Sequence, residues 1–200
     1  MQAISDMSEL EGLYGEPVRR SIDKVLTRLT PSYQRWIAAS RFVILSSVGP
    51  EGTDASPRGD DGPVVRILDD RTVLLPDWMG NNRIDSLRNI VRDPRVSLMF
   101  MVVGNMNVVR INGRAIVTRD SAVLASFDRR GKQPRTVVAV TVDEVYFQCA
   151  KALMRAGIWG GGDDSATVPT AGDFVREVDA VFDGETYDRT YAEYAKPRLW

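Results

Sequence analysis

Three long apolar runs separated by short polar segments dominate the middle of the chain and set limits on its fold. They cover residues 96–103, 107–118 and 136–147. Their length and their valine and isoleucine content predict strands. Gly104-Asn105 forms a turn between the first two runs, and Asn112-Gly113 interrupts the second in a way that is typical of a bulge. Long antiparallel strands with short connections favour a closed β-barrel.

Shorter strands precede these runs. Residues 42–45 predict a buried strand, and a Gly-Pro-Glu-Gly turn leads to a returning partner at 53–57. Residues 64–68 and 72–75 flank three polar residues and predict a hairpin. Strands and helices do not alternate regularly along the chain, which argues against a doubly wound α/β fold.

Helices are expected at both ends of the chain. Apolar residues at helical spacing predict one helix over residues 16–29, and Thr30-Pro31 begins a second helix whose buried side is Trp36 and Ile37. Two helices, at 82–92 and 120–130, are inserted among the strands, and another covers 150–158. The chain is therefore expected to be a single domain of 200 residues. Residues 1–40 form a helical extension, 41–150 the β core, and 151–200 C-terminal helices with a glycine-rich loop.

The C-terminal segment contains a row of aromatic residues. Residues 157–172 are rich in glycine and small polar residues and predict a flexible loop. Residues 172–200 are amphipathic, with Tyr187, Tyr191 and Tyr194 on one stripe. The stripe either packs against the protein's own barrel or contacts a partner.

The chain contains no histidine and one cysteine, Cys149. A Ser-His-Asp triad, a Cys-His pair, an HExxH zinc site and a haem with a histidine ligand are therefore excluded, as is an intrachain disulfide. Any enzyme built on this chain relies on other side chains or on a cofactor that carries the reaction. No secretory leader or long apolar run is present in the sequence, so a cytoplasmic protein is expected.

Residues 80–89, GNNRIDSLRN, follow a predicted strand and begin an amphipathic helix. Ile84, Leu87, Ile90 and Val91 fall on one face of that helix. Free backbone N–H groups and the positive dipole end of a helix suit a phosphate, and Arg83 and Ser86 add side-chain donors. The alternative is an ordinary capped surface helix with solvated polar residues.

A second polar block, Ser56-Pro57-Arg58-Gly59-Asp60, lies at the end of a predicted strand. Alone, it is typical of a turn with a solvated charge pair. Together with the 80–89 block, it places two arginine-bearing loops beside strand ends, where they could converge on one anion.

These blocks, in this order, resemble the pyridoxamine 5′-phosphate oxidase-like family. The resemblance covers about residues 40–160 and is closest to a subgroup of probable FMN-dependent enzymes with the SPRGD and GNNRxDSLRN blocks. Further matching segments are FVILSS at 42–47, DPRVSL at 93–98, RINGRA at 110–115 and FQCAKAL at 147–153. The resemblance implies a mainly β fold with peripheral helices: a split β-barrel of the FMN-binding type with helical N- and C-terminal extensions. It also implies a homodimer with FMN at the subunit interface.

The resemblance implies specific cofactor-binding residues. Arg83 and Ser86 would hold the FMN phosphate with Asn82 nearby. Ser56, Pro57 and Arg58 would line the flavin, and Asp60 would orient Arg58. The strand at 107–110 would pass under the flavin ring. Lys151 would reach the flavin or its phosphate, across the dimer or within one chain; the alternative is a lysine on a helix surface.

Three further side chains have a less specific expectation. Trp78, Met79 and Trp159 are candidates for an apolar shelf or lid over the flavin, although core packing is the more usual role for such residues.

The sequence also departs from the family pattern. The true oxidases carry an Arg-x-x-Leu-Leu-Lys run, but the comparable segment here, VVRILD at 64–69, lacks the lysine. A C-terminal Arg-x-His substrate motif is impossible without histidine. Pyridoxamine phosphate oxidase activity is therefore not assigned.

Two main functional hypotheses follow from this pattern. The first is an FMN-dependent oxidoreductase of unknown substrate, and the second is a non-catalytic flavin-binding or flavin-sensing module. A deazaflavin could replace FMN in either. An oligonucleotide-binding β-barrel is disfavoured by the net charge of −1 and by the absence of a basic aromatic face.

Overall fold

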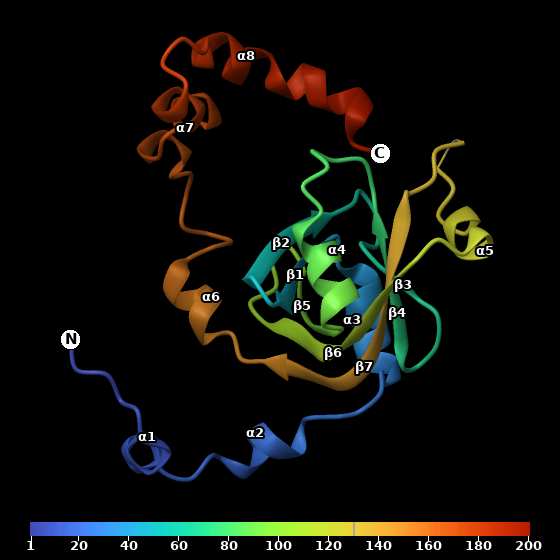
Figure 1. The fold of residues 1–200 in the computed structure, drawn as a ribbon. Helices are drawn as coiled ribbons and strands as arrows, with labels where there is room; N and C mark the ends of the chain where they lie inside the picture. Colours follow the sequence, from blue (N-terminus) through green and yellow to red (C-terminus); the bar gives the residue numbers. More distant parts are fainter. Residues whose placement is uncertain (130) are drawn as a thin grey trace.

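The computed structural model describes residues 1–129 and 131–200, and its centre is one curled antiparallel sheet (Figure 1). The strands follow the order β2-β1-β5-β6-β7-β4-β3. Their bounds are β1 Phe42–Gly49, β2 Gly52–Gly59, β3 Arg66–Ile67, β4 Thr72–Asp77, β5 Arg95–Met101, β6 Val108–Thr118 and β7 Thr136–Gln148.

The barrel is split, which corrects the closed barrel that the strand pattern favoured. The two edge strands are β2 and β3, and β3 has only two residues, so it offers few backbone groups with which to close the sheet. The predicted hairpins formed, because β1 pairs with β2 along its whole length and β3 pairs with β4. The fold is thus mainly β with peripheral helices.

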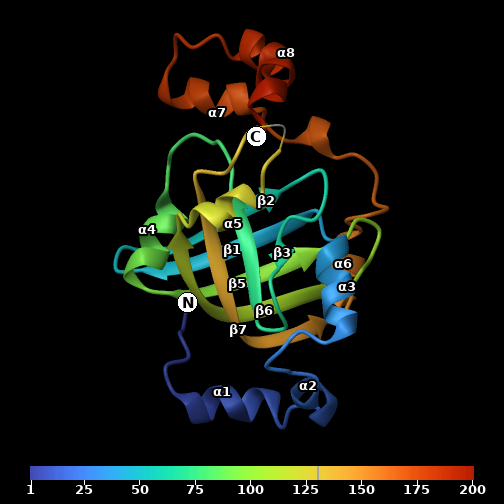
Figure 2. The same ribbon diagram turned by 90° about the vertical axis from the view of Figure 1, so that its right-hand side faces the viewer.

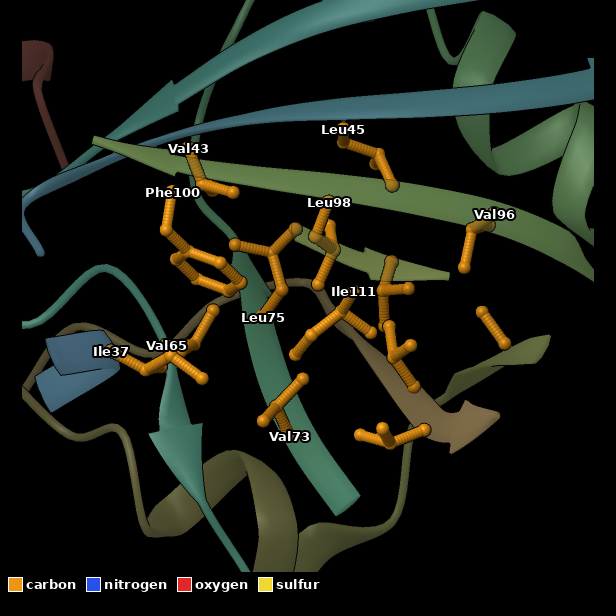
Figure 3. Packing of buried hydrophobic residues seen from close by; sticks show 14 of the residues in the cluster. Ile37, Val43, Leu45, Val65, Val73, Leu75, Val96, Leu98, Phe100 and Ile111 are labelled. Carbon is orange, nitrogen blue, oxygen red and sulfur yellow. The ribbon is translucent and has the colours of Figure 1, made fainter. Parts of the chain in front are cut away.

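The inner face of the curled sheet holds the hydrophobic core (Figure 3). Alternate residues of β1 and β5 point inward, as the period of two in a strand requires. Side chains from five strands and from the segment before β3 meet there. The fully enclosed ones include Val43, Leu45, Val73, Leu98, Phe100 and Ile111. This core fixes the positions of the strand ends that carry the candidate site.

The predicted bulge in β6 is confirmed. The register between β6 and β7 shifts between Asn112 and Gly113. A Cβ added to Gly113 would lie 2.1 Å from the backbone oxygen of Thr141, so only glycine fits. The bulge bends two long strands where the sheet curls.

The N-terminal region is helical, but the helix expected over 16–29 is much shorter. The observed helices are α1 Met7–Tyr14, α2 Arg19–Asp23 and α3 Pro31–Ala39. After α2, the backbone of Leu26 exchanges two hydrogen bonds with Val145 of β7, and the N–H of Leu29 donates to Asp70. These tertiary bonds replace the helical ones. The second helix is confirmed: Thr30 occupies the N-cap position of α3 without a side-chain hydrogen bond, and Pro31 opens the helix. On its expected buried side, Ile37 is fully buried and Trp36 partly so.

The helix expected at 82–92 is α4, Asp85–Arg92, and its inner face is more polar than predicted. Ile90 is buried and Leu87 partly so, but Ile84 and Val91 are exposed. The polar residues Ser86, Asn89 and Arg92 instead bond to the β1–β2 hairpin, through Asp54, Ser47 and Glu51 respectively. Residues spaced by three lie on one helical face, so these contacts set the rotation of α4 on the sheet.

The helix expected at 120–130 is also shorter, because α5 covers only Ser121–Ala125. Ser126 and Phe127 continue it as turns, and Arg130 lies outside the described residues. The short helix expected after β7 is present as α6, Lys151–Ala156.

The C-terminal helices do not pack on the barrel, which contradicts the more usual role considered for the tyrosines. α7 Ala171–Val178 and α8 Gly184–Ala195 pack on each other and stand away from the sheet (Figure 2). Their backbones touch closely at Gly172 and Gly184. Tyr187, Tyr191 and Tyr194 form a row along α8 with neighbouring ring centroids 5.3 and 6.5 Å apart.

The loop between α6 and α7 holds one short 3-10 turn, Ser165–Thr167. Of the helices in the described part of the chain, none combines the length and apolarity needed to cross a bilayer.

Candidate functional site

A cavity of about 580 Å³ lies at the seam between the two ends of the curled sheet. Its walls come from β2, from the ends of β4 and β7 that meet there, and from the loop that leads into α4. Both polar blocks singled out in the sequence line it. Ser56, Pro57, Arg58, Asn82, Arg83 and Ser86 all belong to its lining.

Alternate side chains of β2 form one side of the cavity. Asp54, Ser56 and Arg58 are half-buried, and the residues between them are exposed. β2 pairs only with β1 and is therefore an edge strand. An edge strand tolerates a proline, since one side of its backbone needs no ladder partner, and this explains Pro57.

Arg58 is held by Asp77, which corrects the expectation that Asp60 would orient it. The Arg58 guanidinium donates to the Asp77 carboxylate at 2.5 Å. Asp60 instead accepts from the Trp78 indole at 3.1 Å and faces the Arg129 guanidinium at 3.1 Å. Asp77 ends β4 directly beside Thr136 of β7, so the sheet itself places it opposite β2.

The loop before α4 carries the other side of the cavity. Asn82 has a φ of 63°, an uncommon left-handed conformation for a residue other than glycine. Its side-chain oxygen accepts from the Arg135 guanidinium at 2.8 Å. Arg83 precedes the helix rather than lying in it, and its largely exposed guanidinium donates to Asp85 at 3.0 Å.

Ser86 is almost fully buried in the first turn of α4, and its hydroxyl donates to the Asp54 carboxylate. The cavity is therefore lined by both signs of charge. Three arginines, at 58, 83 and 135, face three aspartates, at 54, 77 and 85. Arg135 reaches an amide oxygen rather than a carboxylate, and Arg83 is largely solvent-exposed, so both cations are accessible to an incoming anion.

Two buried donors at the cavity have no hydrogen-bond partner within the described part of the chain. They are the Thr136 hydroxyl and the Nε of Arg58. Such orphan groups are rare in native proteins unless water or a ligand satisfies them. Both residues line the cavity, so these unpartnered donors lie at its wall.

Sequence reasoning missed several of the lining residues. These are Asp54, Asp77, Arg135 and Thr136, and the signal for Asp54 is its alternation with Ser56 and Arg58. Trp78, a shelf candidate from the sequence, also lines the cavity. Nothing in the sequence pairs Arg135 with Asn82, because their approach depends on β4 lying beside β7.

Lys151 is not brought to the cavity. It follows the far end of β7, whereas Thr136, at the near end, lines the cavity. The start of β6, at Val108–Arg110, pairs with Tyr146–Gln148 and lies at the same far end. Trp159 is also elsewhere, since its indole donates to the carbonyl of Asn105 at 2.8 Å. Met79 lines a smaller neighbouring cavity together with Trp78.

Comparison with known proteins decides the family. Residues 29–149, more than half of the chain, match the family model described as pyridoxamine 5′-phosphate oxidase. The chain belongs to the pyridoxamine 5′-phosphate oxidase family. The split barrel and the two polar blocks are thus those of a family member. A search of the curated proteins found no match to this chain.

Solved structures give likenesses of low sequence identity. HupZ from Group A Streptococcus is 16% identical, with a TM-score of 0.48 over 58% of this chain and 91% of that one. General Stress Protein 26 from Bacillus anthracis is 15% identical, with a TM-score of 0.43 over 57% and 88%. The FAD binding protein from Mycobacterium smegmatis is 17% identical, with a TM-score of 0.40 over 62% and 97%.

Proposed function

We propose that this family member binds FMN in the cavity at the barrel seam and is an FMN-dependent oxidoreductase. The observation that carries the proposal is the convergence of Arg58, Arg83 and Arg135 on one cavity of about 580 Å³. That volume is within the range of cofactor sites. The two sequence blocks that resemble the FMN-binding subgroup form opposite walls of this cavity.

The donor set fits a flavin phosphate. A phosphate dianion favours guanidinium forks and helix-end N–H groups. Arg83 precedes the first turn of α4 and is largely exposed. The Arg135 guanidinium lies beside the same loop, where it donates to the side-chain oxygen of Asn82. We assign the phosphate to Arg83 and Arg135 with Asn82 beside them. Ser86 would join them by donating its hydroxyl to a phosphate oxygen instead of to the Asp54 carboxylate.

The flavin ring is assigned to the β2 side of the cavity. Ser56 and Pro57 line that wall, and Arg58 is fixed by Asp77, so its guanidinium presents a defined direction to a ring carbonyl. The unpartnered Thr136 hydroxyl gains a partner if a flavin oxygen reaches it. When bound, FMN supplies the electron-transfer chemistry at its own ring, so the chain need only bind, orient and exclude water.

Lys151 supports a homodimer with shared sites. β7 has 13 residues, and a strand advances roughly 3.3 Å per residue, so its two ends are up to about 40 Å apart. Lys151 and the start of β6 lie at the opposite end of β7 from Thr136, and neither lines the cavity of its own chain. In the proposal they serve the cavity of a second copy, which places FMN between subunits.

The substrate is proposed to differ from pyridoxamine phosphate, since the chain has no histidine for the family's substrate motif. One observation favours a second candidate, a non-catalytic flavin-binding module. Among the described residues, Asp77 and Asp85 are paired with Arg58 and Arg83, and Asp54 lies beside Ser86 on the proposed phosphate side, so none of these three cavity carboxylates is a free base beside the proposed ring position.

The decisive experiment is a visible absorption spectrum of the purified protein after FMN is added and the sample is desalted. Retention of one FMN per chain is expected, and a deazaflavin titrated in parallel tests the choice of cofactor. Failure to retain either flavin overturns the proposal. Anaerobic addition of NADPH then separates the two candidates, since reduction followed by turnover supports the oxidoreductase. Tight FMN binding that no reduced nicotinamide or amine reduces supports the non-catalytic module.

A further inference from the structure

A second, smaller cavity of about 210 Å³ adjoins the proposed flavin site. The two share the walls formed by Pro57, Arg58, Trp78 and Gly80. Any molecule in the smaller cavity would therefore lie next to a ligand in the larger one. The first polar block lines this second space as well, through residues 57–60, but Val64, Leu75 and Pro76 in its wall are not proposed FMN contacts.

The chemistry of the smaller cavity differs from that of the larger one. Val64, Leu75 and Pro76 are buried and form an apolar floor, and Trp78 and Met79 add further apolar surface. The polar side chain opposite is Asp60, which is 9% exposed and accepts from the Trp78 indole. A site of this kind suits a small molecule with an aromatic or branched aliphatic group.

The C-terminal segment, residues 196–200, reaches this cavity through Leu199. Leu199 lies in the lining although it is far away in sequence from the other walls, on β2 and the segment before β3. The ring of Trp200 stacks on the Arg129 guanidinium at 4.3 Å. Lys132 donates to the backbone oxygens of Pro197 and Trp200 at 3.1 and 3.0 Å. Asp60 and Asp61 in turn bind Arg129, so the cavity wall and the clamp on the tail are linked.

The contacts between residues 196–200 and the barrel are weak enough for this segment to detach. α7 and α8 stand away from the barrel, and the chain returns to it at its C-terminal end (Figures 1 and 2). Leu199 is still half-exposed, and the contacts that hold the tail are surface hydrogen bonds and one cation–π pair. Such contacts contribute little each and exchange readily with water.

We propose that the smaller cavity is the site for the apolar part of the substrate, and that residues 196–200 form a strap whose Leu199 occupies its mouth until the substrate displaces it. The inference rests on the proposed function only in taking the neighbouring cavity as the flavin site. The ligand class is a small molecule with an aromatic or branched aliphatic group and a polar group directed toward Arg58.

The test uses flavin-free full-length protein with ¹³C-methyl methionine, titrated with indole as the probe. Met79 lines the cavity and reports binding directly, whereas Met99 on β5 is an internal control. We expect saturable shifts of the Met79 signal. Lys132→Ala removes two hydrogen bonds that hold the strap in place, so indole displaces Leu199 more easily. The Kd of this variant for indole should therefore be about tenfold lower than that of the unaltered protein. A chain ending at Ala195 should behave in the same way.

Arg189→Ala is the control, because Arg189 lies on α8 outside the strap and its guanidinium donates to Thr186 of the same helix. Its affinity for indole should equal that of the unaltered chain. A Met79 signal that indole does not shift in any variant overturns the cavity assignment. Equal affinities in all four proteins overturn the strap.

An FMN titration of the same proteins separates this inference from the proposed function. Normal FMN binding with a silent Met79 signal overturns the strap site alone. Indole binding that responds to Lys132→Ala in a protein that never retains FMN overturns the flavin assignment and leaves the strapped cavity standing.

Discussion

Arg58 and Asp77 join opposite ends of the sheet. Arg58 lies on β2, the first strand in the spatial order, and Asp77 ends β4, the sixth. Their side chains meet at 2.5 Å and are 24% and 17% exposed. Where a closed barrel would have a hydrogen-bonded ladder, this protein has an ion pair beside a cavity. The seam that leaves the barrel split is thus also where the candidate site forms.

Breaking this pair should affect stability and FMN binding together. We expect Arg58→Met and Asp77→Ala to show a coupling of about 1–3 kcal/mol in a double-mutant cycle, because each removes the ion pair and leaves its half-buried partner unsatisfied. Urea unfolding of the two single variants and the double variant measures the coupling. Additivity of the two effects would show that the pair does not hold the seam.

Arg83→Ala should lose FMN and keep the fold. A charge-assisted hydrogen bond to phosphate contributes about 1.5–3 kcal/mol, which corresponds to a loss of affinity of about tenfold or more. Flavin fluorescence titration measures it. Arg88→Ala is the matched control, since Arg88 lies on α4, a short way along the chain from Arg83, and lines the neighbouring cavity with Glu51 and Arg92 rather than the proposed FMN cavity. Equal FMN affinity in both variants would remove Arg83 from the site.

Asp54→Asn should strengthen FMN binding. Asp54 accepts from Ser86 inside the cavity, and its charge opposes an incoming phosphate dianion. Removing one like charge at this range is worth about 1 kcal/mol, or about fivefold in affinity. The amide oxygen still accepts from Ser86, so the helix position is kept. Weaker binding in this variant would place the phosphate elsewhere.

Gly113→Ala should destabilise the barrel by about 2–4 kcal/mol. The added Cβ would meet the Thr141 backbone oxygen at 2.1 Å within the paired β6–β7 ladder, where neither strand can move freely. Gly62→Ala is the control, because nothing lies within 4 Å of its added Cβ. Thermal unfolding compares the two, and equal midpoints would contradict the steric account.

Asp93 should make stability depend on pH in the acid range. Hydrogen bonds from the Arg95 side chain and backbone lower the pKa of the Asp93 carboxyl from 3.8 to about 2. The folded state therefore binds fewer protons than the unfolded state between these values. Its contribution is complete above the ordinary pKa and is lost as pH falls towards about 2. The difference in unfolding free energy between the unaltered protein and Asp93→Asn should shrink over that range. A constant difference would show that Asp93 does not titrate as described.

The sequence predicted most of the strands because each depends on short-range patterns. The β1–β2 hairpin, the β3–β4 hairpin and the bulge at Asn112-Gly113 all follow from local apolar runs and turn residues. The helices were predicted less well. Residues 16–29 have helical spacing, yet Leu26 pairs with Val145 of β7, a contact that no local pattern contains.

The candidate site was likewise predicted only in part from the sequence. The two polar blocks at 56–60 and 80–89 were visible in the sequence, since each combines arginine with turn and cap residues. Their partners were not visible. Asp77 rather than Asp60 holds Arg58, and Arg135 reaches Asn82, because the β4–β7 pairing brings these residues together.

The sequence by itself determined the β-rich core, the absence of histidine chemistry and the residue types available to bind an anion, because composition and local periodicity fix these. Only the tertiary structure decided that the sheet stays open and that Arg58, Arg83 and Arg135 share one cavity. It also decided that the C-terminal residues return to a neighbouring cavity while α7 and α8 stand apart. These are long-range relationships, and the curvature of the whole sheet sets the distances between them.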